Sequence, residues 1–237
     1  MPLCFLLFVL AQVRPAAQPA PALHLVAESR FTYMASTQTT TSEQWLAESM
    51  TYETRGARVI ITRQDRGVRW VIDTQKRTYS ETTLAPGSDA AKPETANESI
   101  HTAGFSYEPV FAWTVTQTAE TATVNGRTCR LTTADGVADF AGISMKLWLC
   151  PAQEKELERK ANGRILEMAR FRYQDPVTFA TSLLAKQSDV SLLSLEATVD
   201  PPIAPRMLHQ VRFLTFEKGQ PPPGIFDLPG DLQKTSK

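Results

Sequence analysis

The chain has 237 residues, of which 42% are hydrophobic and 21% charged, a globular composition that excludes a disordered or fibrous protein. Its 25 lysine and arginine residues balance its 25 aspartate and glutamate residues. A neutral chain lacks the basic surface that binds nucleic acids or anionic membranes, so neither is expected as a partner.

The first 22 residues are typical of a signal peptide. An apolar run over residues 2–11 is followed by a stretch rich in alanine and proline over 16–22, which offers small residues for cleavage. The run is shorter than the about 20 residues that a membrane-spanning helix needs, and no later segment is long enough. No basic residue precedes the run, which indicates either a misplaced start codon or an atypical signal. A buried N-terminal helix is the alternative interpretation. We expect an exported protein without a transmembrane anchor.

Residues 23–83 predict a meander of β-hairpins, because apolar and polar residues alternate and no helical period persists. The alternating runs are residues 24–33, 45–52, 57–63, 68–73 and 78–82. Turn residues separate the later runs at 64–67 and 74–77. Side chains alternate between the two faces of a strand, so Val68, Trp70 and Ile72 share one face.

A long surface loop is expected over residues 86–106, where small, polar and charged residues replace the alternation. Strand character returns over residues 110–115, 121–124 and 127–132. The dipeptide Asn-Gly at 125–126 is a strong signal for a tight hairpin turn between the last two runs.

Helical spacing of apolar residues first occurs over residues 153–173, which follow Pro151 and carry glutamates in the first turn. Asn162 and Gly163 are expected to kink this helix or to split it in two. Residues 179–186 predict another short helix.

The last part of the chain returns to strands, over residues 191–197 and 207–217. Residues 221–229 are rich in proline and provide one apolar anchor, and residues 231–237 are expected to fray. No internal repeat or linker divides the chain, so we predict a single domain over residues 23–230.

Three cysteines occur, and Cys4 lies in the predicted signal peptide, which leaves Cys129 and Cys150. Folding the chain back around Asp139 and Phe140 sets these two cysteines opposite each other in an antiparallel pair. Cα atoms in such a pair lie about 4.5 Å apart, within reach of a disulfide. The alternative is a redox pair, but redox motifs place their cysteines close together at the start of a helix. We predict a structural disulfide, as is usual in exported proteins.

No constellation of residues predicts a catalytic or metal site. The histidines His24, His101 and His209 are far apart and have no metal-ligand spacing. Neither a Gly-x-Ser-x-Gly elbow nor a glycine-rich phosphate loop occurs. We therefore predict no catalytic residue, no metal and no cofactor, and leave open a triad that forms only in three dimensions.

The aromatic residues have two interpretations. The set comprises Trp70, Tyr79, Phe111, Trp113, Phe140, Trp148, Phe171, Tyr173, Phe213 and Phe216. Ordinary core packing is the favoured interpretation. The alternative is an incompletely filled apolar concavity, because a bent sheet covered by helices can leave space for a ligand. In that case the candidate lining residues are Trp70, Trp113, Trp148 and Phe213.

Three segments occur together: residues 67–79, residues 124–129 leading into 147–150, and the ending Pro-Gly-Ile-Phe-Asp-Leu-Pro over 223–229. Together they resemble a family of exported bacterial proteins related to the periplasmic lipoprotein carriers (LolA/LolB-like). The resemblance covers most of the chain after the signal peptide. It implies a half-open antiparallel β-barrel with helices over its concave face, and a location in the periplasm. The carriers themselves hold acyl chains in an apolar cavity.

The sequence patterns predict a mainly β (α+β) fold, and the resemblance implies a curved antiparallel sheet or half-open β-barrel with helices over the concave face. The favoured function is a non-enzymatic protein, periplasmic or extracellular, that binds a lipid, another apolar ligand or a lipidated partner in the concavity of the sheet. An envelope interaction module with a filled core is the alternative, and an exported hydrolase is the third hypothesis.

Overall fold

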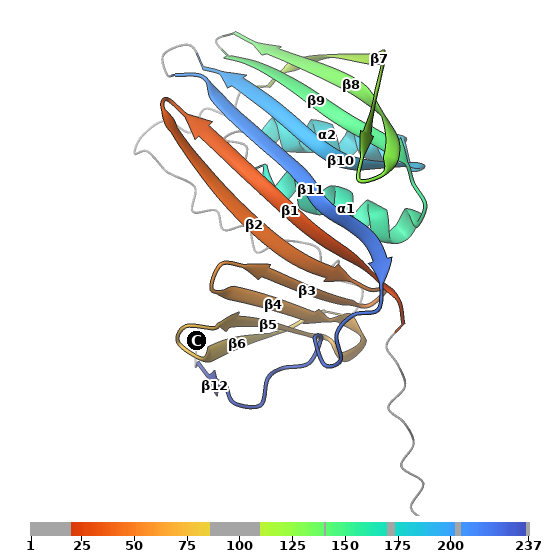
Figure 1. Cartoon of the computed structure of the whole chain (residues 1–237). Helices are drawn as coiled ribbons and strands as arrows, with labels where there is room; N and C mark the ends of the chain where they lie inside the picture. The colour runs from red at the N-terminus through yellow and green to blue at the C-terminus, as the bar shows by residue number, and fades with distance from the viewer. Residues whose placement is uncertain (1–19, 86–109, 140, 170–173, 202–204, 236–237) are drawn as a thin grey trace, which may run out of the picture.

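The computed structural model describes residues 20–85, 110–139, 141–169, 174–201 and 205–235. The strands are β1 (Ala22–Tyr33), β2 (Ser36–Leu46), β3 (Met50–Arg55), β4 (Arg58–Arg63), β5 (Val68–Asp73), β6 (Thr78–Thr83), β7 (Ala112–Val124), β8 (Arg127–Ala138), β9 (Ala141–Pro151), β10 (Val190–Asp200), β11 (Met207–Gly219) and β12 (Gln233–Lys234). They form one sheet of twelve strands in the order β12-β6-β5-β4-β3-β2-β1-β11-β10-β9-β8-β7 (Figure 1). Because β12 and β7 are opposite edges, the sheet is open and not a closed barrel.

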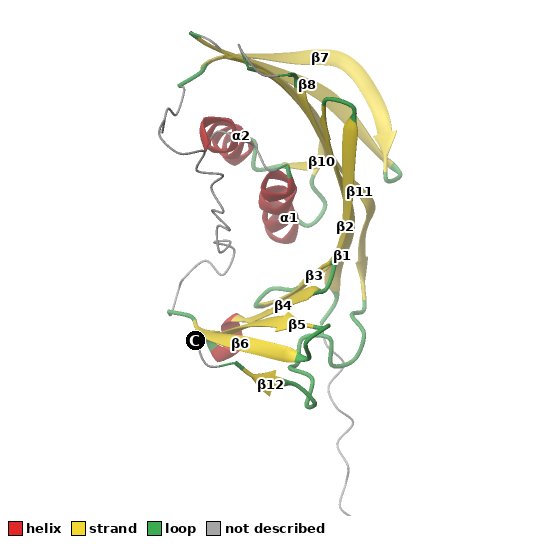
Figure 2. Ribbon diagram, turned by 90° about the vertical axis from the view of Figure 1, so that its left-hand side faces the viewer, coloured by secondary structure: helices red, strands yellow, loops and turns green. Residues whose placement is uncertain are grey.

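The two α-helices of the described chain, α1 (Lys155–Met168) and α2 (Gln174–Lys186), lie on the concave side of the sheet (Figure 2). Neighbouring strands are antiparallel except for β12, which runs parallel to β6. The curved antiparallel sheet with helices over its concave face, which the sequence predicted, is confirmed.

Alternation along β1 gives this strand two different faces. Leu23, Leu25 and Ala27 are buried in the main core together with Ile165 of α1, whereas Glu28 lies on the outer, convex face. Burying one leucine side chain contributes about 2 kcal/mol of stabilisation. The many apolar side chains on the concave side therefore explain why the helices pack there.

The hairpin between β7 and β8 bends back over the outer face (Figure 2). Asn125 and Gly126 have positive φ angles of 48° and 71°, which the predicted tight turn requires. A register shift between Gln117 and Thr121 is the bulge at which β7 turns sharply. The bend lets the side-chain amide of Asn125 donate a hydrogen bond of 2.8 Å to the carbonyl oxygen of Phe213 in β11.

The C-terminal segment, residues 220–235, covers the outer face of β3 to β6. Phe226, part of the predicted apolar anchor, is buried beside Trp45. Arg63 of β4 donates a hydrogen bond of 2.8 Å to Asp227 and so holds the segment in place. Where the sequence predicted fraying, Gln233–Lys234 form the short strand β12 beside β6.

The single strand that the sequence predicted over residues 45–52 belongs to two strands in the structure. β2 ends at Leu46, and β3 begins at Met50. The sequence did not predict β2, since its first six residues, 36–41, are polar and exposed on both faces and show no alternation.

The predicted loop over residues 86–106 and residues 1–19 of the predicted signal peptide lie outside the described residues. Within the described part of the chain, no helix is both long enough and apolar enough to cross a membrane.

Candidate functional site

The first turn of α1 is fixed to the sheet by the buried carboxylate of Glu158. It accepts hydrogen bonds of 3.0 Å from the backbone N–H groups of Gln153 and Glu154, and further ones from the side chains of Ser191 and Arg127. Burial alone would raise the pKa of Glu158, but these donors outweigh it and the pKa is lowered. Glu158 is therefore ionised at neutral pH and joins α1 to β8 and β10.

The middle of α1 is joined to β10 by Asn162. Its side-chain amide donates a hydrogen bond of 3.2 Å to the carbonyl oxygen of Val190 and accepts one of 2.8 Å from the N–H of Leu192. These backbone groups lie beside a bulge in β10 between Leu192 and Ser194. The sequence predicted a kink or a split at Asn162 and Gly163; α1 continues through both residues, so it is not split there.

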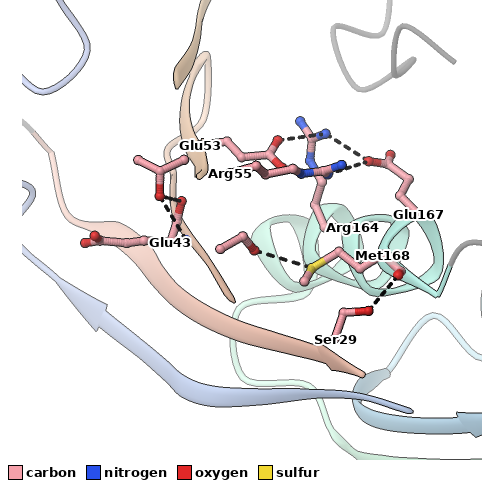
Figure 3. Close-up of polar contacts among 9 residues, drawn as sticks. Ser29, Glu43, Glu53, Arg55, Arg164, Glu167 and Met168 are labelled. Atoms are coloured by element: carbon pink, nitrogen blue, oxygen red, sulfur yellow. Dashed lines mark hydrogen bonds and ion pairs between the residues drawn. The ribbon is translucent and has the colours of Figure 1, made fainter. Parts of the chain in front are cut away.

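The last turn of α1 lies over β1 and β11. Ser29 donates a hydrogen bond of 3.0 Å to the carbonyl oxygen of Met168 (Figure 3). His209 of β11 packs against Phe31, with ring centroids 4.7 Å apart. Burial lowers the pKa of His209 to about 4, with the hydrogen bond to the backbone of Ala169 acting in the opposite direction. His209 is therefore a neutral core residue at pH 7.

A cluster of two carboxylates and two guanidinium groups joins β3 to α1 (Figure 3). Glu53 forms ion pairs with Arg55 and Arg164, and Arg164 also lies 3.1 Å from Glu167. Burial raises the pKa of Glu167, and repulsion from Glu53 adds to this against the opposing effect of the arginines. Gln44, opposite Glu53 in the sheet, is buried with both polar atoms unpaired among the described residues. Because its charges balance, the cluster ties β3 to α1 without an excess of either sign.

α2 is held to the edge strand β7 by a contact that we call the α2 latch, formed by Trp113, Asp175 and Phe179. The ring of Phe179 stacks on the indole of Trp113, with centroids 4.0 Å apart and planes 6° apart. Asp175 accepts hydrogen bonds of 2.9 Å from the indole N–H of Trp113 and of 3.4 Å from the backbone N–H of Phe111. Gly136 of β8 makes room for the indole, because an added Cβ would lie 2.9 Å from its ring.

α2 lies farther from the sheet than α1 does (Figure 2). The backbone of α1 approaches β10, whereas the backbone of α2 approaches α1 more closely than any strand. Side chains such as Phe179, Leu183 and Leu184 fill the space between α2 and the sheet and belong to the main core. This apolar layer between α2 and the concave face is the candidate binding site.

The four predicted lining residues are divided between the two faces of the sheet. Trp113 and Phe213 face the helices, Trp113 in the α2 latch and Phe213 in the main core. Trp148 lies on the outer face, in a groove under the β7–β8 hairpin. Trp70 lies on the outer face beneath the C-terminal segment and donates a hydrogen bond of 2.9 Å to Glu81. The four residues do not form one site, and ligand contact by any of them stays a prediction.

The groove that Trp148 lines has a volume of about 400 Å³ and is polar. Glu28 pairs with Arg30 and Arg212, and Lys146 lies 3.3 Å from Glu196. With Glu120, the lining contains three anions and three cations, so the groove offers little net charge to an ionic ligand.

Cys129 and Cys150 are joined by a disulfide between β8 and β9, with Cα atoms 4.1 Å apart. Ala138 pairs with Ala141 at the other end of the same two strands. The hairpin therefore turns where the sequence predicted, and the predicted disulfide is present.

The described histidines do not converge. His24 stacks on Trp45, with centroids 4.3 Å apart, and contacts Glu43 at 3.1 Å. It alternates with the buried Leu25 and so lies on the outer face, opposite to His209. His101 lies outside the described residues. The described segments contain no cluster of three or more metal-ligating side chains.

No protein-family model matches the sequence, and no curated protein matches it. Similar solved structures include PNGF-II, at a TM-score of 0.36 and 8% identity over 91% of this chain; the match spans only 31% of PNGF-II. A DUF1329 family protein from Desulfovibrio piger matches at a TM-score of 0.34 and 8% identity, over 90% of this chain and 91% of its own. A putative outer membrane lipoprotein-sorting protein domain from Vibrio parahaemolyticus matches at 0.30 and 5% identity, over 86% and 88%. Similarity of this degree does not assign the ligand or the activity of these proteins to this chain.

Sequence reasoning missed two members of the α2 latch, Asp175 and Phe179, and the glycine beneath it, Gly136. Asp175 stands before a proline in the first turn of α2, which is a helix-start signal that would have extended the predicted helix. Nothing local in the sequence indicates that Trp113 rests on Gly136, because their pairing depends on strand register.

Proposed function

We propose that this protein is a non-enzymatic, periplasmic binding protein that holds a lipid-like apolar ligand, or the acyl chain of a lipidated partner, between the concave face of the sheet and α2. The observation that carries the proposal is the attachment of α2. This helix rests on apolar side chains and is fastened to the edge strand by the α2 latch, formed by Trp113, Asp175 and Phe179.

In this proposal, the entering ligand replaces apolar contacts between α2 and the sheet by its own apolar contacts with the sheet. The latch opens, α2 moves away from β7, and an acyl chain takes the place of side chains such as Leu183 against the sheet. Each buried methylene of the chain contributes about 0.8 kcal/mol, which offsets the loss of the contacts within the protein. α1 stays in place, because Glu158 binds it to Arg127 and Ser191 and Asn162 binds it to the backbone of β10.

Three buried ionisable groups support a binding role over catalysis, because each is already paired or enclosed within the protein. Glu158 is saturated by four donors, Glu53 is paired with two arginines, and His209 is enclosed beside Phe31. We also propose that residues 1–22 are removed on export and that residues 23–230 form one domain. The Cys129–Cys150 disulfide supports an oxidising compartment.

Native mass spectrometry of protein purified from periplasm tests the proposal. We expect a co-purifying lipid, and after delipidation saturable binding of the dye 1-anilinonaphthalene-8-sulfonate. The variant Phe179→Ala should change ligand retention, whereas Trp148→Ala in the outer groove should not. Absence of both lipid and dye binding would contradict the proposal.

An envelope interaction module with a filled core is the second candidate. The close packing of Leu147, Leu195 and Val211, each at most 1% exposed, favours it. In this case crosslinking in cells should trap a protein partner, and delipidation should leave the mass and the stability of the purified protein unchanged.

A further inference from the structure

A separate apolar pocket lies on the outer face, between strands β3–β5 and the C-terminal segment. Its volume of about 360 Å³ falls within the roughly 300–1,000 Å³ of small-ligand pockets. Val59, Ile61 and Ile72 form its floor, and Ile225 and Leu232 form its roof. Both α-helices lie on the other side of the sheet (Figure 2), so this pocket is distinct from the space beneath α2.

The lining of this pocket suits an alkyl chain. Floor and roof are branched aliphatic side chains, which offer shape and dispersion contacts but no hydrogen bonds. Tyr52 completes the lining on β3, and burial, with the charge of Glu43 adding to it, raises the pKa of its phenol. A raised phenol pKa is consistent with apolar surroundings.

Among the described residues that line the pocket, Arg77 is the one cation, and its ion pair can exchange. Arg77 holds the C-terminal segment twice, because its carbonyl oxygen accepts a hydrogen bond of 3.0 Å from Gln233 and its side chain pairs with Asp231. Arg77 and Asp231 are 64% and 62% exposed, so their ion pair is weak and exchanges readily. The other acid that lines the pocket, Asp227, pairs with the largely buried Arg63 at 2.8 Å and with Arg66 at 3.6 Å.

Arg77 also has a backbone φ of 54°, a left-handed conformation that is uncommon for residues other than glycine. Arg77 is the last residue of the turn between β5 and β6, and Met34 has the same φ in the turn between β1 and β2, so the hairpin accounts for this conformation. The guanidinium presents a fork of N–H donors that matches a carboxylate in two parallel hydrogen bonds.

We propose that this pocket binds the alkyl chain of a fatty acid, with the carboxylate on Arg77 in place of Asp231. This site goes beyond the function proposed above and does not depend on it. The aliphatic lining selects the chain, and the exchangeable arginine at the mouth selects the anionic head.

Binding of octanoate, nonanoate and decanoate, measured by calorimetry, tests the aliphatic lining. Because each buried methylene adds about 0.8 kcal/mol, affinity should rise about fourfold per added carbon until the pocket is full. Val59→Trp fills the pocket and should abolish decanoate binding. Ile60→Trp is the matched control, because Ile60 is half-buried on the opposite face of the same strand, and it should leave binding unchanged. Thermal denaturation monitors whether each variant is folded.

The head group is tested by two substitutions with opposite expected effects. Arg77→Gln should weaken decanoate binding about tenfold and leave decanol binding unchanged, since a charged hydrogen bond is lost. Asp231→Asn removes the competitor and should strengthen decanoate binding several-fold. A purely structural role of the Arg77–Asp231 pair predicts weakening in both variants, and that result would overturn the assignment of the head.

The location is tested with 11-bromoundecanoate, whose bromine quenches nearby tryptophan. A variant that keeps only Trp70, which lies in the same apolar cluster, should be quenched, and a variant that keeps only Trp148, in the polar outer groove, should not. No quenching of Trp70, equal binding by Val59→Trp and Ile60→Trp, or no binding of decanoate by the unsubstituted protein would each overturn the proposal.

Discussion

Cys129 and Cys150 are the residues whose place followed most directly from the sequence. Strand alternation and a turn at residues 139–140 set them opposite each other, and the pairing of β8 with β9 has that register. A local hairpin is predictable because its register depends on a short loop. The contact of Asn125 with Phe213 was not predictable, because it joins residues 88 positions apart in the sequence.

Replacing both cysteines by alanine should lower the free energy of unfolding by about 3 kcal/mol, because the bond closes a loop of 21 residues in the unfolded chain. Urea denaturation of Cys129→Ala/Cys150→Ala beside the oxidised protein measures the loss. A loss below about 1 kcal/mol would show that the disulfide contributes little to stability.

His209 should make the stability of the protein sensitive to mild acid. Its pKa is lowered from 6.5 in the unfolded chain to about 4 in the folded protein, so the unfolded state binds its proton first as the pH falls. The contribution of the neutral imidazole is complete above pH 6.5 and is lost between 6.5 and about 4, amounting to about 3 kcal/mol. Urea denaturation of His209→Gln across this range should give a flatter pH profile. An unchanged profile would contradict the role of His209.

At the scale of elements, Glu158 should be essential for docking α1. Glu158→Gln leaves Arg127, with 10% of its side chain exposed, without its ionic partner, and breaking a buried pair costs about 3 kcal/mol. Glu156→Gln is the control, because that carboxylate is 80% exposed and bonds only Arg159 among the described side chains. Since the pKa of Glu158 is lowered, its contribution should disappear as the pH falls below about 4.5. Equal stability of both variants would refute this role.

Gly136 should control how firmly α2 is held. In Gly136→Ala the new Cβ meets the indole of Trp113, so the ring must shift away from Phe179 and the α2 latch should loosen. Hydrogen exchange should become faster in α2 and stay unchanged in α1. Gly142→Ala in β9 is the matched control, because a Cβ there meets nothing within 4 Å. Equal exchange in both variants would show that the latch does not hold α2.

Element prediction succeeded where side chains alternate, as in β4 and β5, and at the turn of Asn125 and Gly126. It failed for β2, whose first half is polar on both faces and is a strand because β1 pairs with it. The sequence placed the start of α2 too late, at Phe179, because Asp175 and Pro176 do not continue an apolar period.

At the scale of the molecule, sequence patterns predicted a mainly β chain with helices near its C-terminal half, and the family resemblance implied the curved sheet with helices over its concave face, which the structure has. They did not predict that Trp70 and Trp148 lie on the outer face. Those positions result from the C-terminal segment and the β7–β8 hairpin folding over the convex side, which is decided by long-range packing.

The central claim, that an apolar ligand lies between α2 and the concave face, is tested most directly by quenching of Trp113. In the variant Trp45→Phe/Trp70→Phe/Trp148→Phe, titration with a phosphatidylcholine that carries bromine on an acyl chain should quench the remaining tryptophan saturably. A companion variant that keeps only Trp148, in the outer groove, should not be quenched. No quenching of Trp113, or equal quenching of both tryptophans, would contradict the claim.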